Sequence, residues 1–350
     1  MAEFPLLMMI AVILAGYLYW GITTLPREGW QILAAVPVRK MEGEGWSGVN
    51  LTWYGLLSAN AYAFAVVLLF ILMGAVRVPL AGTAALAAAM LSLCVPASRL
   101  VARLVEKKAH TFTVAGAVFV GVLMAPWIVL LLNRTMGVEW GFYVSPAAAL
   151  AAFAIAYAFG EGLGRLACVS FGCCYGRALN DAPPWLARLF AKHSFSFYGK
   201  TRKIAYAGGL EGERVLPVQA LTAIIHVCCG LGSIVLFLHC RFVEAFVVTM
   251  AVTQGWRVLS ELLRADYRGA GKVSAYQIMG VIGILYGSAA IILAPATSLS
   301  RPDLSGGIAT LWHPGVLISI QALWLGIFYY TGRSTVTGAT LSFHIHRERV

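Results

Sequence analysis

Long apolar runs constrain this chain more than any other feature of its sequence. About 20 apolar residues are enough to cross the hydrocarbon core of a bilayer as a helix. Because a bilayer offers the backbone no water, each such run is expected to be helical. Nine runs have this length: 4–26, 51–76, 78–98, 111–133, 141–160, 215–238, roughly 243–263, 273–300 and 306–332. Arg257 and Glu261 interrupt the run at 243–263. The sequence therefore predicts an all-α, polytopic transmembrane protein of about nine spanning helices.

Composition agrees with lipid as the main solvent of the chain. Hydrophobic residues make up 60% and charged residues only 12%, about half the charged fraction of soluble domains. A net charge of +11 could indicate binding to nucleic acid. In a membrane protein, basic loops more simply face anionic headgroups or phosphate-bearing substrates. Basic loops that only set the topology are an equally good explanation. We therefore expect a membrane and an anionic phospholipid as partners, and no nucleic acid.

Two groups of charged residues fall within or beside the predicted spans. Glu161 and Arg165 are four residues apart, hence on one helical face. Arg257 and Glu261 repeat that spacing, and Arg264 and Asp266 follow. A lone charge inside a membrane costs about 2.5–3.5 kcal/mol on insertion scales, so such residues usually face a partner or a wet cavity. Internally satisfied ion pairs that only fix helix packing are the simpler explanation, whereas gathered guanidinium groups also suit phosphate. We expect both groups to meet in one cavity near one membrane face.

Cysteine and histidine patterns give no metal or cofactor prediction. Cys168, Cys173 and Cys174 lie close in sequence, but no second ligand pair has zinc spacing, so the expected metal is none. The chain has neither a nucleotide-type glycine loop nor a zinc-protease helix motif, and no cofactor is expected. His344 and His346 are interpreted as part of a solvated tail.

Four stretches of the sequence, 53–56, 164–177, 217–219 and 257–266, resemble in their order the motifs of the bacterial prolipoprotein diacylglyceryl transferases. Residues 164–177 are similar to the family signature, in which a second Gly-Arg pair begins eleven residues after the arginine of the first. Trp53-Tyr54-Gly55-Leu56 resembles the opening of the first conserved helix, and 217–219 resembles its Pro-Thr-Gln segment. Residues 257–266, followed by Gln277, resemble its Arg…Glu…Arg stretch. The resemblance covers roughly residues 50–297.

The resemblance implies a transferase in the inner (cytoplasmic) membrane of a bacterium. Members of that family move the diacylglyceryl group of phosphatidylglycerol to a cysteine of a preprolipoprotein. Arg165 and Arg257 would be catalytic and bind the headgroup phosphate, with Glu261 orienting Arg257. Arg177 and Arg264 would line the entrance. The implied substrate-binding residues are Tyr54, Glu161, Gly176, Arg177, Gln219 and Arg264.

Three positions depart from the family pattern. Val114 stands where the family has a histidine often taken as the base, Cys168 replaces an asparagine, and Thr253 replaces a tyrosine. His110 lies one turn from Val114 and is expected to be solvated. Because general-base help is worth about 10²–10⁴-fold, thioether formation on a lipobox peptide is expected to be slow or absent. The acceptor would then be a variant thiol, amine or hydroxyl, or the protein would be a non-catalytic phospholipid-binding or lipid-transport protein on the same scaffold.

The resemblance also divides the chain and bears on its orientation. Residues 51–297 form the transferase-like membrane domain, with a long arm at 166–214. Residues 1–50 add a retained helix and loop, and 298–350 add a helix and tail. In the arm, the pattern of residues 185–192 indicates a short helix, either in the headgroup layer or packed on the protein.

The membrane side that carries the signature also carries 21 of the 26 Lys and Arg residues. The positive-inside rule makes that side cytoplasmic, whereas the family topology makes it periplasmic. The family orientation is slightly preferred.

Overall fold

The computed structural model describes residues 3–27, 31–40, 42, 45–107, 113–267, 273–295, 299–333 and 342–344. Within these residues, nine helices are long and apolar enough to span a membrane. They are α1 (Glu3–Thr24), α2 (Trp53–Ala75), α3 (Leu80–Glu106), α4 (Val114–Arg134), α6 (Pro146–Phe171), α9 (Val218–Leu238), α10 (Phe242–Leu263), α11 (Ala275–Ile292) and α13 (Pro314–Gly332). The predicted all-α, multi-pass membrane architecture is confirmed.

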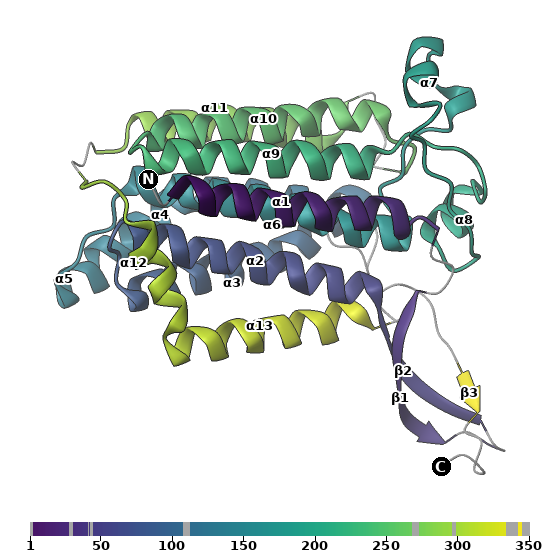
Figure 1. Ribbon diagram of the computed structural model, residues 1–350, viewed down its shortest axis with the longest axis horizontal. Helices are drawn as coiled ribbons and strands as arrows, with labels where there is room; N and C mark the ends of the chain where they lie inside the picture. The colour runs from purple at the N-terminus through teal and green to yellow at the C-terminus, as the bar shows by residue number, and fades with distance from the viewer. Residues whose placement is uncertain are drawn as a thin grey trace.

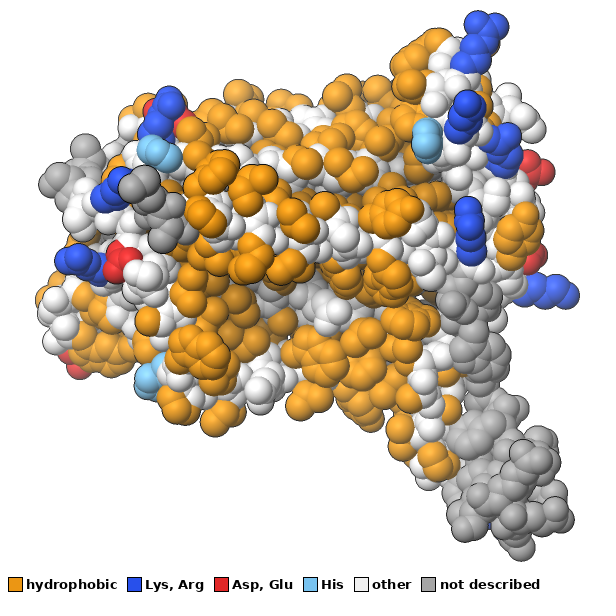
Figure 2. Space-filling model, viewed as in Figure 1, with side chains coloured by type: hydrophobic (Ala, Val, Ile, Leu, Met, Phe, Trp, Pro, Cys, Tyr) orange, Lys and Arg blue, Asp and Glu red, His pale blue; other side chains and the backbone are white. Residues whose placement is uncertain are grey.

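The long helices run side by side and form one bundle (Figure 1). Hydrophobic side chains cover the middle of the visible face, while Lys, Arg, Asp and Glu gather at its two ends (Figure 2). This is the distribution expected of a protein in which lipid surrounds the middle of the helical bundle. The sheet and the short helices of the arm extend from the same end of the bundle (Figure 1).

Helix α6 is the centre of the bundle and the most buried of the nine spans. It packs against α2 on one side and against α9 and α10 on the other, while α13 lies along the outside of α2. Its first half is rich in alanine, and small side chains allow membrane helices to approach closely. Ser145 caps its start, where its hydroxyl accepts a hydrogen bond from the Ala148 amide, and Pro146 occupies the first helical position.

Two spans continue beyond their predicted ends. Helix α3 runs through Arg99 and Arg103 to Glu106. Helix α6 runs through Glu161 and Arg165 to Phe171, so these two charged residues lie inside the helix rather than after it. In α6 the four-residue spacing pairs the two charges, so the helix can carry them without a break.

The last predicted run is divided in two. Helix α12 (Leu304–Ala309) is followed by a 3₁₀ turn, η2 (Thr310–Trp312), and α13 begins only at Pro314. The Asp303 carboxylate accepts a hydrogen bond from the Ser305 amide at the start of α12. A proline lacks the amide that a continuing helix would need, so Pro314 begins a new helix. The remaining short helices are α5 (Met136–Trp140), η1 (Leu179–Asp181), α7 (Pro184–Phe190) and α8 (Lys203–Gly208).

A small antiparallel sheet adds strand to the predicted all-α fold. Its strands are β1 (Ile32–Lys40), β2 (Gly45–Thr52) and β3 (Ser342–His344), in the order β1-β2-β3. Residues 1–50 therefore hold a helix and most of a hairpin, not a helix and a loop. Val36 and Val38 are β-branched residues that favour extended backbone. His344 lies in β3, whereas His346 and His110 lie outside the described residues.

The predicted short helix of the arm is present as α7. Leu186 is buried and forms a small apolar cluster with Leu216 and Val218, against which Phe190 packs. Trp185 and Leu189 are 67% and 61% exposed. The apolar side of the helix is therefore divided between the protein and the surroundings. Packing on the protein is confirmed for Leu186 and Phe190, and a place in the headgroup layer stays a prediction. Arg188 lies in the last turn of α7, while Lys192 follows its end.

Candidate functional site

A cavity of about 810 Å³ lies among the helices on the α2, α3 and α4 side of α6. This is within the range of small-molecule pockets. Most of its walls are apolar, and its polar residues include Glu161, Arg165, Arg257, Arg264 and Asp266. Both groups of charged residues therefore meet in one cavity, as predicted.

Glu161 joins Arg165 of the first group to Arg257 of the second. One carboxylate oxygen is paired with Arg165 of the same helix, and the other with Arg257 of α10. The side chain of Glu161 is 2% exposed. The packing of α10 against α6 brings Arg257 opposite Glu161. We call Arg165, Glu161 and Arg257 the shared-carboxylate cluster.

The shared-carboxylate cluster has one more positive charge than negative charge. Each guanidinium has five N–H donors, yet both use only an Nη2 nitrogen toward Glu161. The Nε atoms of Arg165 and Arg257 are buried without a hydrogen-bond partner. Unpaired buried donors and a buried net charge are expensive. The cluster is therefore suited to bind an anion.

Three further residues of this network were missed by the sequence analysis. Tyr157 donates a hydrogen bond to Glu161, and its oxygen accepts from Gln254 Nε2 at 2.9 Å and Arg257 Nη2 at 3.1 Å. His226 of α9 is 1% exposed, with Nε2 3.6 Å from the Glu161 carboxylate. A signal for Tyr157 was available, because Tyr157, Glu161 and Arg165 repeat every four residues along one helix face. No comparable sequence signal marked His226 or Gln254.

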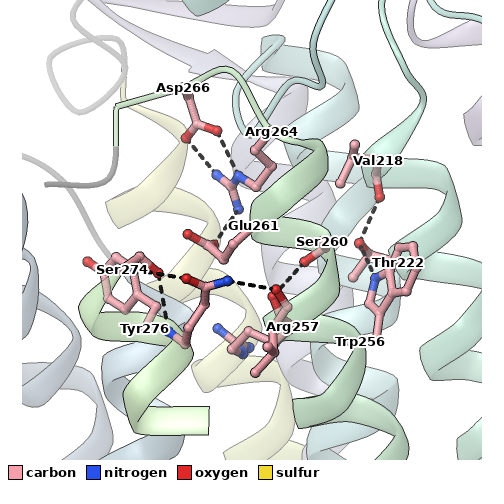
Figure 3. Close-up of polar contacts among 12 residues, drawn as sticks. Val218, Thr222, Trp256, Arg257, Ser260, Glu261, Arg264, Asp266, Ser274 and Tyr276 are labelled. Atoms are coloured by element: carbon pink, nitrogen blue, oxygen red, sulfur yellow. Dashed lines mark hydrogen bonds and ion pairs between the residues drawn. The ribbon is translucent and has the colours of Figure 1, made fainter. Parts of the chain in front are cut away.

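The other three residues of the second group, Glu261, Arg264 and Asp266, pair with one another. Arg264 Nε and Nη2 donate to both oxygens of Asp266 at 2.7 and 2.6 Å, and Arg264 Nη1 lies 3.8 Å from Glu261 (Figure 3). We call these residues the closed cluster. Glu261 was expected to orient Arg257, but the carboxylate paired with Arg257 is Glu161. Helix packing places Glu161 opposite Arg257, so the Glu161 carboxylate holds this guanidinium.

A tight turn after α6 brings three cysteines together. Gly172 caps the helix with φ +67°, and Cys174 also has a positive φ of 56°. The Cys173 amide donates to the Cys168 carbonyl at 3.1 Å, so the chain folds back on its own last turn. The Sγ atoms of Cys168, Cys173 and Cys174 lie within 4.8 Å of one another. All three residues line the cavity. We call them the thiol cluster.

Two side chains hold this turn in place. Gln219 Nε2 donates to the Cys173 carbonyl at 2.9 Å. Arg202 is 1% exposed and donates to the carbonyls of Val169 and Ser170 at 3.3 and 3.1 Å. A cation at the carbonyl end of a helix is favoured by the helix dipole. Hydrogen bonds with the Cys168 and Cys173 thiols, with Arg264 and Arg165 nearby, hold the pKa of Cys174 well below its ordinary value.

The predicted substrate-binding residues divide into two sets. Tyr54, Glu161 and Arg264 line the cavity, where the Tyr54 ring meets Phe171 edge-on at 5.7 Å. Gly176, Arg177 and Gln219 are not among the residues that line it. Gly176 pairs with Arg264 through the backbone, and a Cβ on Gly176 would collide with Leu216. Arg177 is exposed, and its amide donates to the Leu263 carbonyl at 2.9 Å.

The three departures from the family pattern also have defined places. Val114 and Cys168 line the cavity. Thr253 is buried, and its hydroxyl donates to the Thr249 carbonyl of its own helix at 2.7 Å. A phenol lies beside the charged residues all the same, that of Tyr157, which contacts both Glu161 and Arg257.

In comparisons with known proteins, no protein-family model and no curated protein sequence matches the chain. The case for a function therefore rests on the short motifs and on the geometry of the cavity.

Proposed function

We propose that the protein is a bacterial membrane transferase resembling the prolipoprotein diacylglyceryl transferases. It would move a diacylglyceryl group from phosphatidylglycerol to a prolipoprotein cysteine or a variant acceptor. One observation carries the proposal: a buried carboxylate shared by Arg165 and Arg257 leaves an excess positive charge and two unpaired Nε donors beside a mostly apolar cavity. An anionic headgroup with apolar chains matches that combination.

The chemistry follows from where charge develops. The acceptor sulfur would lose its proton and form a bond to the terminal carbon of the diacylglyceryl group. The bond between that carbon and the phosphate oxygen would break, and its electrons would stay on the departing glycerol phosphate. The phosphate thereby gains one negative charge. Arg165 and Arg257 would stabilise this charge, as pre-aimed donors do in other transfer reactions.

Lipid retention is the direct test of headgroup binding. Arg165→Gln and Arg257→Gln should each retain at least about tenfold less phosphatidylglycerol, because a charged hydrogen bond contributes about 1.5–3 kcal/mol. Arg241→Gln is the matched control, since Arg241 is exposed and precedes the first residue of α10, whereas Arg257 lies near the other end of that helix. The measurement is mass spectrometry of lipids that co-purify with folded protein in detergent. Equal retention by all three variants would overturn headgroup binding at this site.

The alternative function is non-catalytic lipid binding or transport on the same scaffold. It is favoured by Val114, a cavity-lining residue that cannot take a proton. Incubation with phosphatidylglycerol and a lipobox peptide separates the two functions. A thioether on the peptide supports transfer, whereas retained lipid with an unmodified peptide supports the alternative.

The proposed location is the bacterial inner membrane, with the cavity's charged end facing the periplasm. The structure offers two reporters at opposite ends of the bundle. A cysteine at Lys200, in the arm, should react with a membrane-impermeant maleimide in intact cells. The native Cys240 is exposed between α9 and α10 and should react only after lysis. The reverse pattern would place the site on the cytoplasmic side.

A further inference from the structure

The thiol cluster is a feature that the proposed headgroup site does not use. Cysteines that act only as small hydrophobes are usually buried among apolar side chains. Cys168, Cys173 and Cys174 instead line the cavity, beside Arg165 and Arg264. Cys94 lines the same cavity outside the cluster. The cluster therefore has both a defined geometry and access to the space that substrate would occupy.

The geometry of the cluster fits a thiophilic metal ion. Tetrahedral zinc holds sulfur at about 2.3 Å, which sets the sulfurs about 3.8 Å apart. The three Sγ atoms already lie within 4.8 Å of one another, so closure around an ion requires movement of about 1 Å at most. The backbone turn is fixed by Gln219 and by the Arg202 contacts to the end of α6. Such supporting contacts are typical of metal sites, where they orient the ligands.

We propose that Cys168, Cys173 and Cys174 bind a Zn²⁺ ion through three thiolates and leave a fourth coordination position open to the cavity. Sites with three protein ligands and one open position are the arrangement that catalytic zinc uses. Thiolate ligands select soft or borderline ions rather than magnesium or calcium. The sequence pattern did not predict this site, because the three ligands come from one turn rather than from two separated pairs.

The local charges favour this site. Three thiolates around Zn²⁺ carry a net charge of −1. Arg165, whose cluster carries the excess positive charge, interacts electrostatically with Cys174, and Lys203 lines the same part of the cavity and interacts with Cys173 and Cys174. A negatively charged metal–thiolate group would be stabilised by these cations, whereas a bare divalent ion would be repelled by them. The basic surroundings therefore support thiolate-bound zinc and disfavour a carboxylate-type cation site.

The open position suggests a role in activating the acceptor; this step rests on the proposed function. An acceptor thiol that binds as fourth ligand would release its proton to water, because a coordinating thiol is deprotonated. Its sulfur would then form the bond to the diacylglyceryl carbon as the bond from that carbon to the phosphate oxygen breaks. The resulting thioether is a weaker ligand than a thiolate and would leave the zinc. This chemistry needs no base at position 114.

Metal binding can be tested without lipid or turnover. Reduced protein in detergent, stripped with a chelator and then equilibrated with zinc, should retain one zinc per chain by elemental analysis. Cys168→Ser, Cys173→Ser and Cys174→Ser should each bind zinc more weakly by at least the 10–100-fold typical of disturbing a site's supporting shell. Cys94→Ser should bind zinc like the wild type. Absence of zinc from the reduced wild type, or equal binding by all four variants, would overturn the site.

Cobalt provides a spectroscopic readout of thiolate coordination. Co²⁺-loaded wild type and Cys94→Ser should show the thiolate-to-metal charge-transfer absorption, and the cluster variants should lose it. Addition of a lipobox cysteine peptide should shift the spectrum, whereas the serine peptide should not. A cobalt spectrum that ignores the cysteine peptide would overturn the acceptor role while leaving the metal site. Arg257→Gln, which tests lipid binding, should bind zinc normally, so the two proposals fail separately.

Discussion

The shared-carboxylate cluster and the closed cluster contain the same residue types but balance their charges differently. In the first, Arg165 and Arg257 share the single carboxylate of Glu161. In the second, the single guanidinium of Arg264 contacts the carboxylates of both Asp266 and Glu261 (Figure 3). Both clusters reach the same cavity. They differ in which sign of charge is in excess among their members.

The difference in charge balance indicates which arginines are available to bind an anionic ligand. A buried guanidinium that meets two carboxylates has little electrostatic need of another anion, and its pairing stabilises the local fold. Two guanidiniums on one carboxylate leave donors and charge for a ligand to satisfy. The ratio of arginine to carboxylate in the folded protein therefore distinguishes an anion site from a structural pair better than the presence of arginine does.

The largest loss of folding stability is expected at Glu161, because it is the one carboxylate shared by Arg165 and Arg257. Glu161→Gln would leave two buried guanidiniums without a counter-charge, which typically costs about 3–5 kcal/mol. We expect a corresponding loss of folding stability, measured by thermal or denaturant unfolding in detergent. Glu244→Gln is the control, because its pair with Arg241 is exposed and such pairs are worth about 0–1 kcal/mol.

A triple variant keeps this prediction testable if Glu161→Gln does not fold. Combining it with Arg165→Met and Arg257→Met removes all three charges and replaces them with apolar volume. Such replacements are often neutral or stabilising, so the triple variant should be more stable than Glu161→Gln alone. If it is less stable, the effect of Glu161 is not mainly one of charge.

In the closed cluster, neutralising a carboxylate should reduce folding stability by less than in the shared-carboxylate cluster. Asp266→Asn removes the bidentate partner of Arg264 but leaves Glu261 at 3.8 Å. We expect a loss of about 1–3 kcal/mol, the range for one charged hydrogen-bonded contact, in the same unfolding measurement. A loss as large as that of Glu161→Gln would show that the second carboxylate does not compensate, and would remove the distinction between the clusters.

Much of the fold could be predicted because a bilayer restricts the choice of structure. All nine apolar runs correspond to spanning helices, and the predicted helix in the arm is α7. The hairpin of β1 and β2 was missed because, at the end of the bundle, length and hydropathy no longer decide between loop and strand. The division of the last run at Pro314 was also missed, since apolarity alone does not register a helix start.

The sequence predicted which residues line the site better than it predicted which of them contact one another. The spacing of Glu161 and Arg165 gave their pairing, because that contact is within one helix. Glu261 was expected to orient Arg257 because the family resemblance implied it. The contact observed for Arg257 is between helices, and such contacts depend on rotation and packing that strongly apolar segments do not encode. For the same reason His226 and Gln254 were not foreseen. The thiol cluster depends on the left-handed backbone at Gly172 and Cys174, which no spacing rule captures.

The smallest effect is expected at Tyr157, which supports the shared-carboxylate cluster without adding charge. Tyr157→Phe keeps the ring but removes one donor to Glu161 and the acceptor used by Gln254 and Arg257. Because Glu161 keeps both ion pairs, we expect a loss of only about 1–2 kcal/mol in the same unfolding measurement. Tyr62→Phe, a cavity-lining tyrosine away from the cluster, should have less effect. Phosphatidylglycerol retention should stay near wild type, since the Nε donors of Arg165 and Arg257 are untouched. A loss equal to that of Glu161→Gln would mean that the phenol, and not charge balance, holds the two arginines together.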